Sequence, residues 1–401
     1  MTGGPPRVPR PAPIGSQPPA APLWLLALLT FSGTLAMHIF VPALPTAAAG
    51  LHANAGTMQL TVSLYIVGLA VGQLFYGPLS DRFGRRPVLI SGLALYAAAG
   101  LAAALAPNAP ILIVARLLQA LGGCAGLVLG RAIVRDTATS QLAAKRLALM
   151  NLMVTIGPGL APLIGGLLAT IFGWRSILYA LAGFGVANLL CAWRLLPETA
   201  SPAVRSKGSS IPNHYLRLLR SPSFLGYAVG GGCATTAMYA FIAAAPFIFS
   251  GRLHRPAHEV GIYLGVLISG VWLGSMAASR LVEAVALDKL LVRANLLSVL
   301  AAFTLLTAVL ADQLSVPFAV GSMFVFSLGA GIASPAALTL AISVDPEIIG
   351  SASGLYGFTQ MVVGAACTAL AGLGSDPALA AALVLSGAGI ISQFSFWRAA
   401  A

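Results

Sequence analysis

The stretch GPLSDRFGRRP, residues 77–87, decides how the whole chain is interpreted. It is the first dense polar segment of the sequence, and an apolar run of roughly twenty residues lies on each side of it. A helix that faces lipid cannot carry Asp81 beside Arg82, Arg85 and Arg86. The stretch therefore predicts a short polar connection between two spanning helices, at a membrane surface.

The composition indicates a membrane protein. Of the 401 residues, 58% are hydrophobic and 8% are charged, whereas soluble domains have about 25% charged residues. The net charge of +12 could suggest nucleic-acid binding, but the basic residues are scattered singly between apolar runs. We therefore expect no nucleic-acid partner and a surface in contact with the lipid bilayer.

The four cysteines give no sign of a metal or a disulfide. Cys124, Cys191, Cys233 and Cys367 all fall inside apolar runs, without the spacing of ligand or disulfide pairs. We interpret them as small core residues and expect no metal and no cofactor.

Twelve apolar runs are long enough to span a bilayer as helices. They cover residues 23–42, 58–80, 88–106, 110–132, 147–171, 175–196, 223–249, 259–280, 290–311, 315–337, 350–373 and 377–397. The first run is longer than the apolar core of a usual signal peptide, so it is counted as a span.

The polar segment 197–222 divides the twelve runs into six and six. We expect an all-α polytopic membrane protein whose twelve transmembrane helices form two pseudosymmetric six-helix bundles, residues 23–196 and 223–401. Residues 1–22 are rich in Pro, Gly and Ala and are expected to form a disordered cytoplasmic arm.

The distribution of Lys and Arg predicts the orientation. With a cytoplasmic N-terminus, 18 of the 22 basic residues lie on the cytoplasmic side, and Arg175, Arg252 and Arg255 lie outside. The remaining one, Arg116, lies inside the fourth run. Both termini are therefore expected in the cytoplasm, with the protein in the inner membrane.

The opening stretch resembles a signature of the major facilitator superfamily, in the connection between the second and third helices. Its Gly-x-x-x-Asp-Arg-x-Gly-Arg-[Arg/Lys] pattern is matched by Gly77, Asp81, Arg82, Gly84, Arg85 and Arg86. The resemblance implies that the acidic residue contacts a helix end of the other half and that the arginines form a charge network steadying the outward-facing state. Asp81 and Arg85 would then hold the halves together, with Arg135 and Asp136 as further members.

Other segments are similar to the Bcr/CflA drug-resistance subfamily of proton-coupled efflux pumps. The run from Arg116 to Gln119 resembles the fourth-helix motif, and Val41–Pro45 and Pro346–Phe358 resemble the end of helix 1 and the start of helix 11. The fifth-helix antiporter motif is resembled by Gly157, Pro158, Pro162 and Gly165. The resemblance implies efflux of small amphipathic compounds by proton antiport and alternating access, in a monomer without enzymatic activity.

Arg116 and His38 are the residues expected to couple protons to transport. A charge near the middle of a span costs about 2.5–3.5 kcal/mol, so Arg116 should face the bundle interior and line the cavity; the alternative, snorkelling, needs a position near a helix end. The subfamily usually has an acidic residue where this chain has His38. A histidine titrates near neutral pH, although a neutral, hydrogen-bonded His38 is an equal alternative.

The substrate cavity is expected to be apolar with a few polar groups. Its predicted lining residues are Phe40, Tyr65, Gln73, Gln119, Tyr239 and Phe247, although an aromatic residue taken alone more often serves core or lipid-facing packing. A transporter of a defined metabolite, such as a sugar or amino acid derivative, with or without proton coupling, remains the alternative function. The sequence disfavours a receptor, because it has no long exterior loop, and an enzyme, because it has no nucleophile–base or metal-ligand grouping.

Overall fold

The computed structural model describes residues 21–137, 140–199, 211–345 and 348–400. Nearly all of the predicted arm at 1–22 lies outside these ranges. Residues 200–210 of the predicted linker and the Pro346-Glu347 pair of the helix-11 resemblance also lie outside them.

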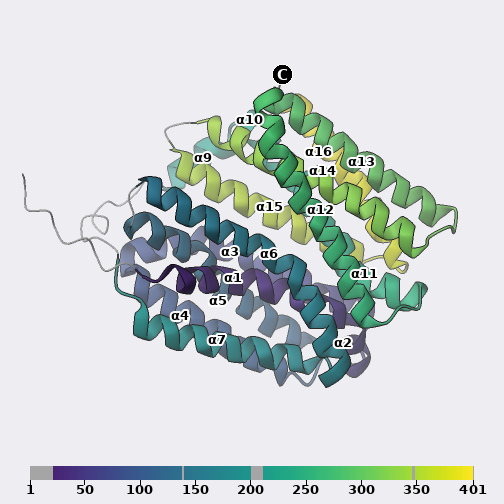
Figure 1. Ribbon diagram of the computed structural model, residues 1–401, viewed down its shortest axis with the longest axis horizontal. Coiled ribbons are helices and arrows are strands. Elements are labelled where there is room, and N and C mark those ends of the chain that lie inside the picture. Colours follow the sequence, from purple (N-terminus) through teal and green to yellow (C-terminus); the bar gives the residue numbers. More distant parts are fainter. Residues whose placement is uncertain (1–20, 138–139, 200–210, 346–347, 401) are drawn as a thin grey trace, which may run out of the picture.

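Two helical bundles make up the described chain (Figure 1). The first contains α1 (Leu23–Ile39), η1 (Val41–Ala43), α2 (Leu44–Gly50), α3 (Ala55–Phe83), α4 (Arg85–Ala104), α5 (Ala109–Thr137), α6 (Ser140–Phe172) and α7 (Arg175–Leu195). After α9 (Ile211–Leu219), the second contains α10 (Pro222–Thr236), α11 (Met238–Phe247), η2 (Ile248–Arg252), α12 (Ala257–Ala284), α13 (Leu287–Leu310), α14 (Val316–Ser343), α15 (Ile349–Gly372) and α16 (Pro377–Ala400).

Eleven helical segments of the described chain are long and apolar enough to cross a membrane. The segments Leu23–Gly50 and Pro222–Arg252 each join several consecutive elements into one span. The twelfth predicted span corresponds to α6, a helix of 33 residues whose apolar described part, Gly157–Phe172, is shorter than the others. The prediction of a polytopic all-α membrane protein is confirmed.

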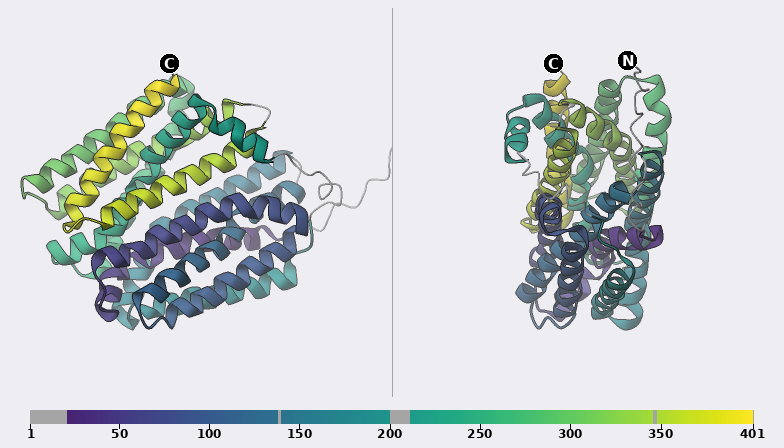
Figure 2. Two further views of the ribbon diagram at one scale, coloured as in Figure 1. Left: turned by 180° about the vertical axis from the view of Figure 1, so that it is seen from behind. Right: turned by 90° about the vertical axis from the view of Figure 1, so that its left-hand side faces the viewer.

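The most extensive contacts between the bundles are made by two related pairs of helices. Figure 2 shows the bundles from behind and from the side. The α3 helix of the first bundle packs against α15 of the second, and α6 packs against α12. Each pair joins the second spanning segment of one bundle to the fifth of the other, as pseudosymmetry requires.

The two ends of α3 mark the two ends of the molecule. We call the end with Gly56 and Gly372 the Gly56 end, and the end with Gly84 the Gly84 end. At the Gly56 end the bundles touch through backbone, since a Cβ on Gly56 would clash with the Gly372 carbonyl oxygen. Near the Gly84 end, a Cβ on Gly77 of α3 would meet no atom within 4 Å. The helices of the two bundles are therefore closely packed at the Gly56 end.

The stretch 77–87 is not a polar loop, contrary to the sequence prediction. The α3 helix continues to Phe83 and α4 begins at Arg85, so Gly84 alone connects them. Its φ of 101° and ψ of 152° lie in a region that only glycine adopts readily. The polar residues therefore lie on the last turn of one helix and the first turn of the next, and these helices extend past their apolar parts.

Candidate functional site

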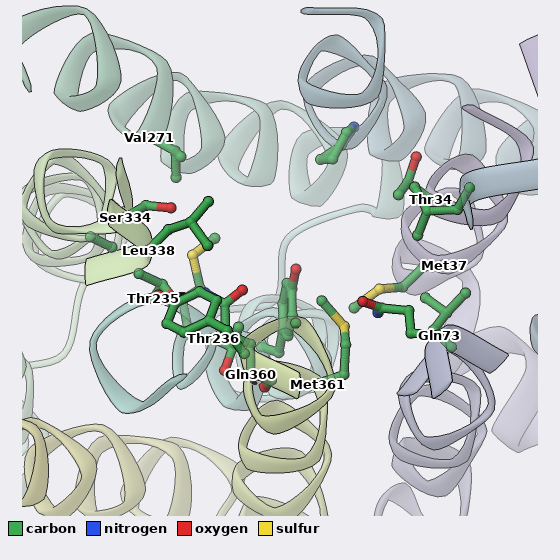
Figure 3. A pocket seen from close by; sticks show the side chains of 18 of the residues that line it. Thr34, Met37, Gln73, Thr235, Thr236, Val271, Ser334, Leu338, Gln360 and Met361 are labelled. Carbon is green, nitrogen blue, oxygen red and sulfur yellow. Dashed lines mark hydrogen bonds between the residues drawn. The ribbon is translucent and has the colours of Figure 1, made fainter. Parts of the chain in front are cut away.

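A cavity of about 380 Å³ lies between the two bundles. Its walls come from α1, α3, α5 and α6 of the first bundle and from α10, α11, α12, α14 and α15 of the second. Figure 3 shows Thr34, Met37 and Gln73 facing Thr235, Ser334 and Leu338 across it. Its size is within the range of sites for drug-sized ligands.

The cavity wall is apolar with a small polar cluster on α10 and α15. The Gln360 side-chain nitrogen donates to the Thr235 hydroxyl at 2.8 Å. The Thr236 hydroxyl contacts the main-chain carbonyl oxygen of Gln360 at 2.9 Å and donates to the Gly232 carbonyl oxygen at 2.7 Å. The bond to Thr235 fixes the Gln360 side-chain amide at the cavity surface, where it can orient a polar group of a ligand.

His38 is part of the cavity wall, although its side chain is buried. Its Nδ1 lies 2.9 Å from the Thr34 carbonyl oxygen, one helical turn earlier. Because a carbonyl oxygen only accepts, this contact requires a proton on Nδ1 and leaves Nε2 as the basic nitrogen. The ring stands edge-on to Tyr239 of α11, with 6.0 Å between ring centroids. His38 therefore links the two bundles through an aromatic contact at the cavity.

Three of the predicted cavity and coupling residues line this cavity: His38, Gln73 and Tyr239. Pro158 of the antiporter motif lines it as well. Phe40, Tyr65, Gln119 and Phe247 do not belong to its lining. Tyr65 and Phe40 instead pack around Arg116, with its guanidinium carbon 4.3 Å and 5.4 Å from the respective ring centroids.

Arg116 does not line the cavity, contrary to the sequence prediction. It is fully buried inside the first bundle. Its guanidinium donates to the Gln119 side-chain oxygen at 2.7 Å and to the Ala36 carbonyl oxygen of α1 at 2.6 Å. The cost of a charge in lipid correctly predicts that Arg116 lies inside the bundle. The bundle interior contains packed helix interfaces as well as the cavity, and Arg116 lies at such an interface.

The cavity also contains residues that the sequence did not single out. Gln360 and the two threonines on α10 are polar residues inside apolar runs, and Trp272 is one aromatic among many. Arg131 was counted as a basic residue of the cytoplasmic edge, yet it lines the cavity from α5. The sequence signal that could have identified these polar residues is a polar side chain inside an apolar spanning run.

The charged residues of the opening stretch form a network within the first bundle. The Arg85 guanidinium contacts Asp81 at 2.7 Å and Asp136 of α5 at 3.0 Å. The backbone N–H groups of Arg85 and Arg86 donate to Glu198, at 2.9 Å and 3.3 Å. The negative carboxylate of Glu198 therefore lies at the N-terminus of α4, where it interacts favourably with the positive end of the helix dipole.

This network does not join the two halves in the present structure, contrary to the sequence prediction. All of the described contacts of Asp81 and Arg85 lie within the first bundle. The close contact of α3 with α15 through Gly56 and Gly372 lies at the opposite end of α3. Arg82 and Arg135 stand beside the network: Arg82 lies over the Phe83 ring, and Arg135 borders a pocket with Asp81 and Asp136.

The segment that resembles the antiporter motif lies on α6 at the contact of three helices. A Cβ on Gly165 would clash with the Ile39 carbonyl oxygen of α1, and one on Gly157 would lie 2.5 Å from the Phe31 ring. The Pro162 carbonyl oxygen faces Gly261 of α12 in the second bundle. The prolines inside α6 interrupt its hydrogen-bond ladder. The motif thus lies where α6 packs against α1 and α12.

The family follows from comparison with known proteins. Residues 26–368 match the model of the Major Facilitator Superfamily, and the chain belongs to this family. It is therefore a multi-pass membrane transporter of small molecules and not an enzyme.

Named relatives agree with this assignment over most of the chain. The chain is 30% identical to an uncharacterized MFS-type transporter, YdgK of Bacillus subtilis, covering 93% of this chain and 94% of that protein. It is 25% identical to a bicyclomycin resistance protein homolog of Haemophilus influenzae, with 93% and 94% covered. It is 29% identical to multidrug resistance protein D of Escherichia coli, with 85% of each covered.

The solved structures share the fold. The crystal structure of a D-xylose–proton symporter has a TM-score of 0.76 at 14% identity, covering 94% of this chain and 96% of that one. The nucleoside transporter NupG has a TM-score of 0.73, also at 14% identity. At these identities the likeness concerns the fold alone.

Proposed function

We propose that this protein exports small amphipathic compounds across the inner membrane by proton antiport with alternating access. The observation that carries the proposal is the cavity between the bundles, whose largely apolar wall also holds the titratable side chain of His38. The relatives named for bicyclomycin resistance and multidrug resistance support drugs as the transported class.

Alternating access is supported by the placement of the close contacts. The bundles meet through backbone at the Gly56 end, where Gly56 approaches the Gly372 carbonyl oxygen. Rocking of one bundle against the other would break this contact at the Gly56 end and bring the bundles together at the Gly84 end. With both termini cytoplasmic, the Gly84 end faces the cytoplasm, and a structure closed at the Gly56 end corresponds to the inward-facing state of the proposed cycle.

Asp81 and Arg85 take part in this movement in the proposed cycle. The Asp81 side chain is 41% exposed, so it retains an oxygen for a helix end of the second bundle when the Gly84 end closes. The carboxylate would then interact favourably with the helix N-terminus, as the family resemblance implies.

His38 is the proposed proton carrier. Proton arrival at Nε2 would make the imidazole cationic at the cavity wall, and departure would make it neutral. A proton and the drug would then compete for one site, because His38 lies on the wall of the cavity proposed to bind the drug. This competition is the basis of the proposed exchange in a monomer.

The function is tested in a bacterial host that lacks its own efflux pumps. We expect expression of this protein to lower the accumulation of several chemically unrelated amphipathic drugs, and a protonophore to abolish this effect. A protein that leaves all drugs of a broad panel at the level of the empty host, while moving a single sugar or amino acid derivative, would support the alternative function instead.

A further inference from the structure

Among the described residues that line the cavity, Arg131 is the one whose side chain stays charged at every physiological pH. It extends from α5 into the space between the bundles. The other lining residues are neutral apart from the titratable His38, and no aspartate or glutamate is among those that the structure describes. The cavity therefore carries a net positive charge.

Arg131 differs from Arg116 and Arg85 in its partners. The Arg116 guanidinium donates to Gln119 and to the Ala36 carbonyl oxygen, and Arg85 pairs with Asp81 and Asp136. The Nε atom of Arg131 is buried without a hydrogen bond, as is that of Arg116, but within the described ranges no carboxylate pairs with the Arg131 side chain. A guanidinium without such a partner can donate two hydrogen bonds to an anion.

The neighbouring carboxylates do not neutralise Arg131. The adjoining pocket at the Gly84 end contains Asp81 and Asp136 together with Arg85 and Arg135. These two acidic and two basic residues balance one another, and both carboxylates contact Arg85. The charge of Arg131 is therefore not cancelled by this pocket.

We propose that Arg131 makes this cavity selective for amphipathic compounds that carry a carboxylate or similar anionic group. This inference rests on the proposed function and specifies its substrate class. The anionic group would bind the Arg131 guanidinium, and the apolar body would lie against Met37, Leu338 and Met361 of both bundles. The Gln360 amide would hydrogen-bond a second polar group.

The selectivity is tested with three ligands that share one aromatic skeleton: a carboxylate, its neutral methyl ester and the corresponding primary amine. Binding to the purified full-length protein is followed by quenching of tryptophan fluorescence, because Trp272 lines the cavity. We expect the carboxylate to bind at least about tenfold more tightly than the ester, the effect of one charge-assisted hydrogen bond. The amine should bind most weakly.

Variants assign the preference to Arg131. The Arg131→Gln variant should bind the ester as the wild type does and lose the preference for the carboxylate, while Arg131→Lys should keep most of it. The matched control is Arg398→Gln, which removes one positive charge from the exposed end of α16 and should leave the preference unchanged.

The outcomes separate the two proposals. Equal or tighter binding of the ester by the wild type, or an unchanged preference in Arg131→Gln, would refute the anion selectivity while leaving the efflux function standing. If none of the three ligands binds and the host assay shows no drug efflux either, the proposed function itself is wrong.

Discussion

Arg116 donates a hydrogen bond to the Ala36 carbonyl oxygen, and so ties α5 to α1 two residues before His38. The same guanidinium binds the Gln119 oxygen one turn further along α5 and contacts the faces of Tyr65 and Phe40. Arg116 thus holds the helix that presents His38 to the cavity. Because it lies outside the cavity lining, we expect it to act through the position of α1.

Replacement of Arg116 should therefore act first on stability. In Arg116→Met the buried Gln119 oxygen loses its partner, and we expect the free energy of unfolding to fall by about 1–3 kcal/mol. The thiols of Cys124, Cys233 and Cys367 are free and buried, so a thiol-reactive dye reports the unfolding temperature of the solubilised protein. An Arg116→Met protein with unchanged unfolding and abolished transport would show instead that Arg116 acts directly in coupling.

The close contact at the Gly56 end predicts a variant with shifted conformation. In Gly56→Val, the added side chain collides with the Gly372 carbonyl, and overpacking of this kind costs about 1–3 kcal/mol. The balance between the two conformations should shift by about tenfold toward the one in which the Gly56 end is open. Gly77→Ala is the control, because its Cβ meets no neighbour within 4 Å.

This shift can be measured with Thr235→Cys, which places a thiol on the cavity wall, in a background without the four native cysteines. A membrane-impermeant maleimide applied from the Gly56 side should alkylate it faster in Gly56→Val than in Gly77→Ala. Equal rates in both variants would argue against a gate at Gly56.

The Arg85 network predicts unequal roles for its two carboxylates. Asp81 contacts Arg85 one turn away across Gly84, and exposed pairs of this kind contribute about 0.2–1 kcal/mol. Asp136, 27% exposed, joins α5 to α4 and should contribute more to the first bundle. A double-mutant cycle on unfolding should give a larger coupling for Arg85 with Asp136 than with Asp81; the reverse order would contradict this division.

The sequence predicted the helices well because lipid requires long apolar segments whose backbone bonds are internal. Eleven of the spans stand out in the described chain, and the family resemblance is confirmed. The prediction of a polar loop at residues 77–87 was wrong, because polar residues there were taken as the sign of a loop. A helix tolerates them once it extends beyond the apolar region, and only Gly84 needs a backbone outside the helical range.

The site was less accessible to sequence analysis, because lining a cavity depends on which face of a helix meets the other bundle. Arg116 and Arg131 lie on the same helix, α5, yet the first is packed against α1 and the second faces the cavity. The sequence placed Arg116 inside the fourth apolar run and Arg131 at its end, and it did not show which helix face each would take. His38 was identified because the subfamily that the chain resembles usually has an acidic residue at this position. No comparable departure from the family pattern pointed to Gln360.

Proton exchange through His38 is tested most directly in liposomes that contain the purified protein and a trapped pH-sensitive dye. An imposed drug gradient should drive protons in the opposite direction to the drug in the wild type. In His38→Gln the proton signal should vanish while exchange of labelled for unlabelled drug continues, because glutamine cannot be protonated at this pH. Drug movement without proton movement in the wild type, or an undiminished proton signal in His38→Gln, would contradict the proposal.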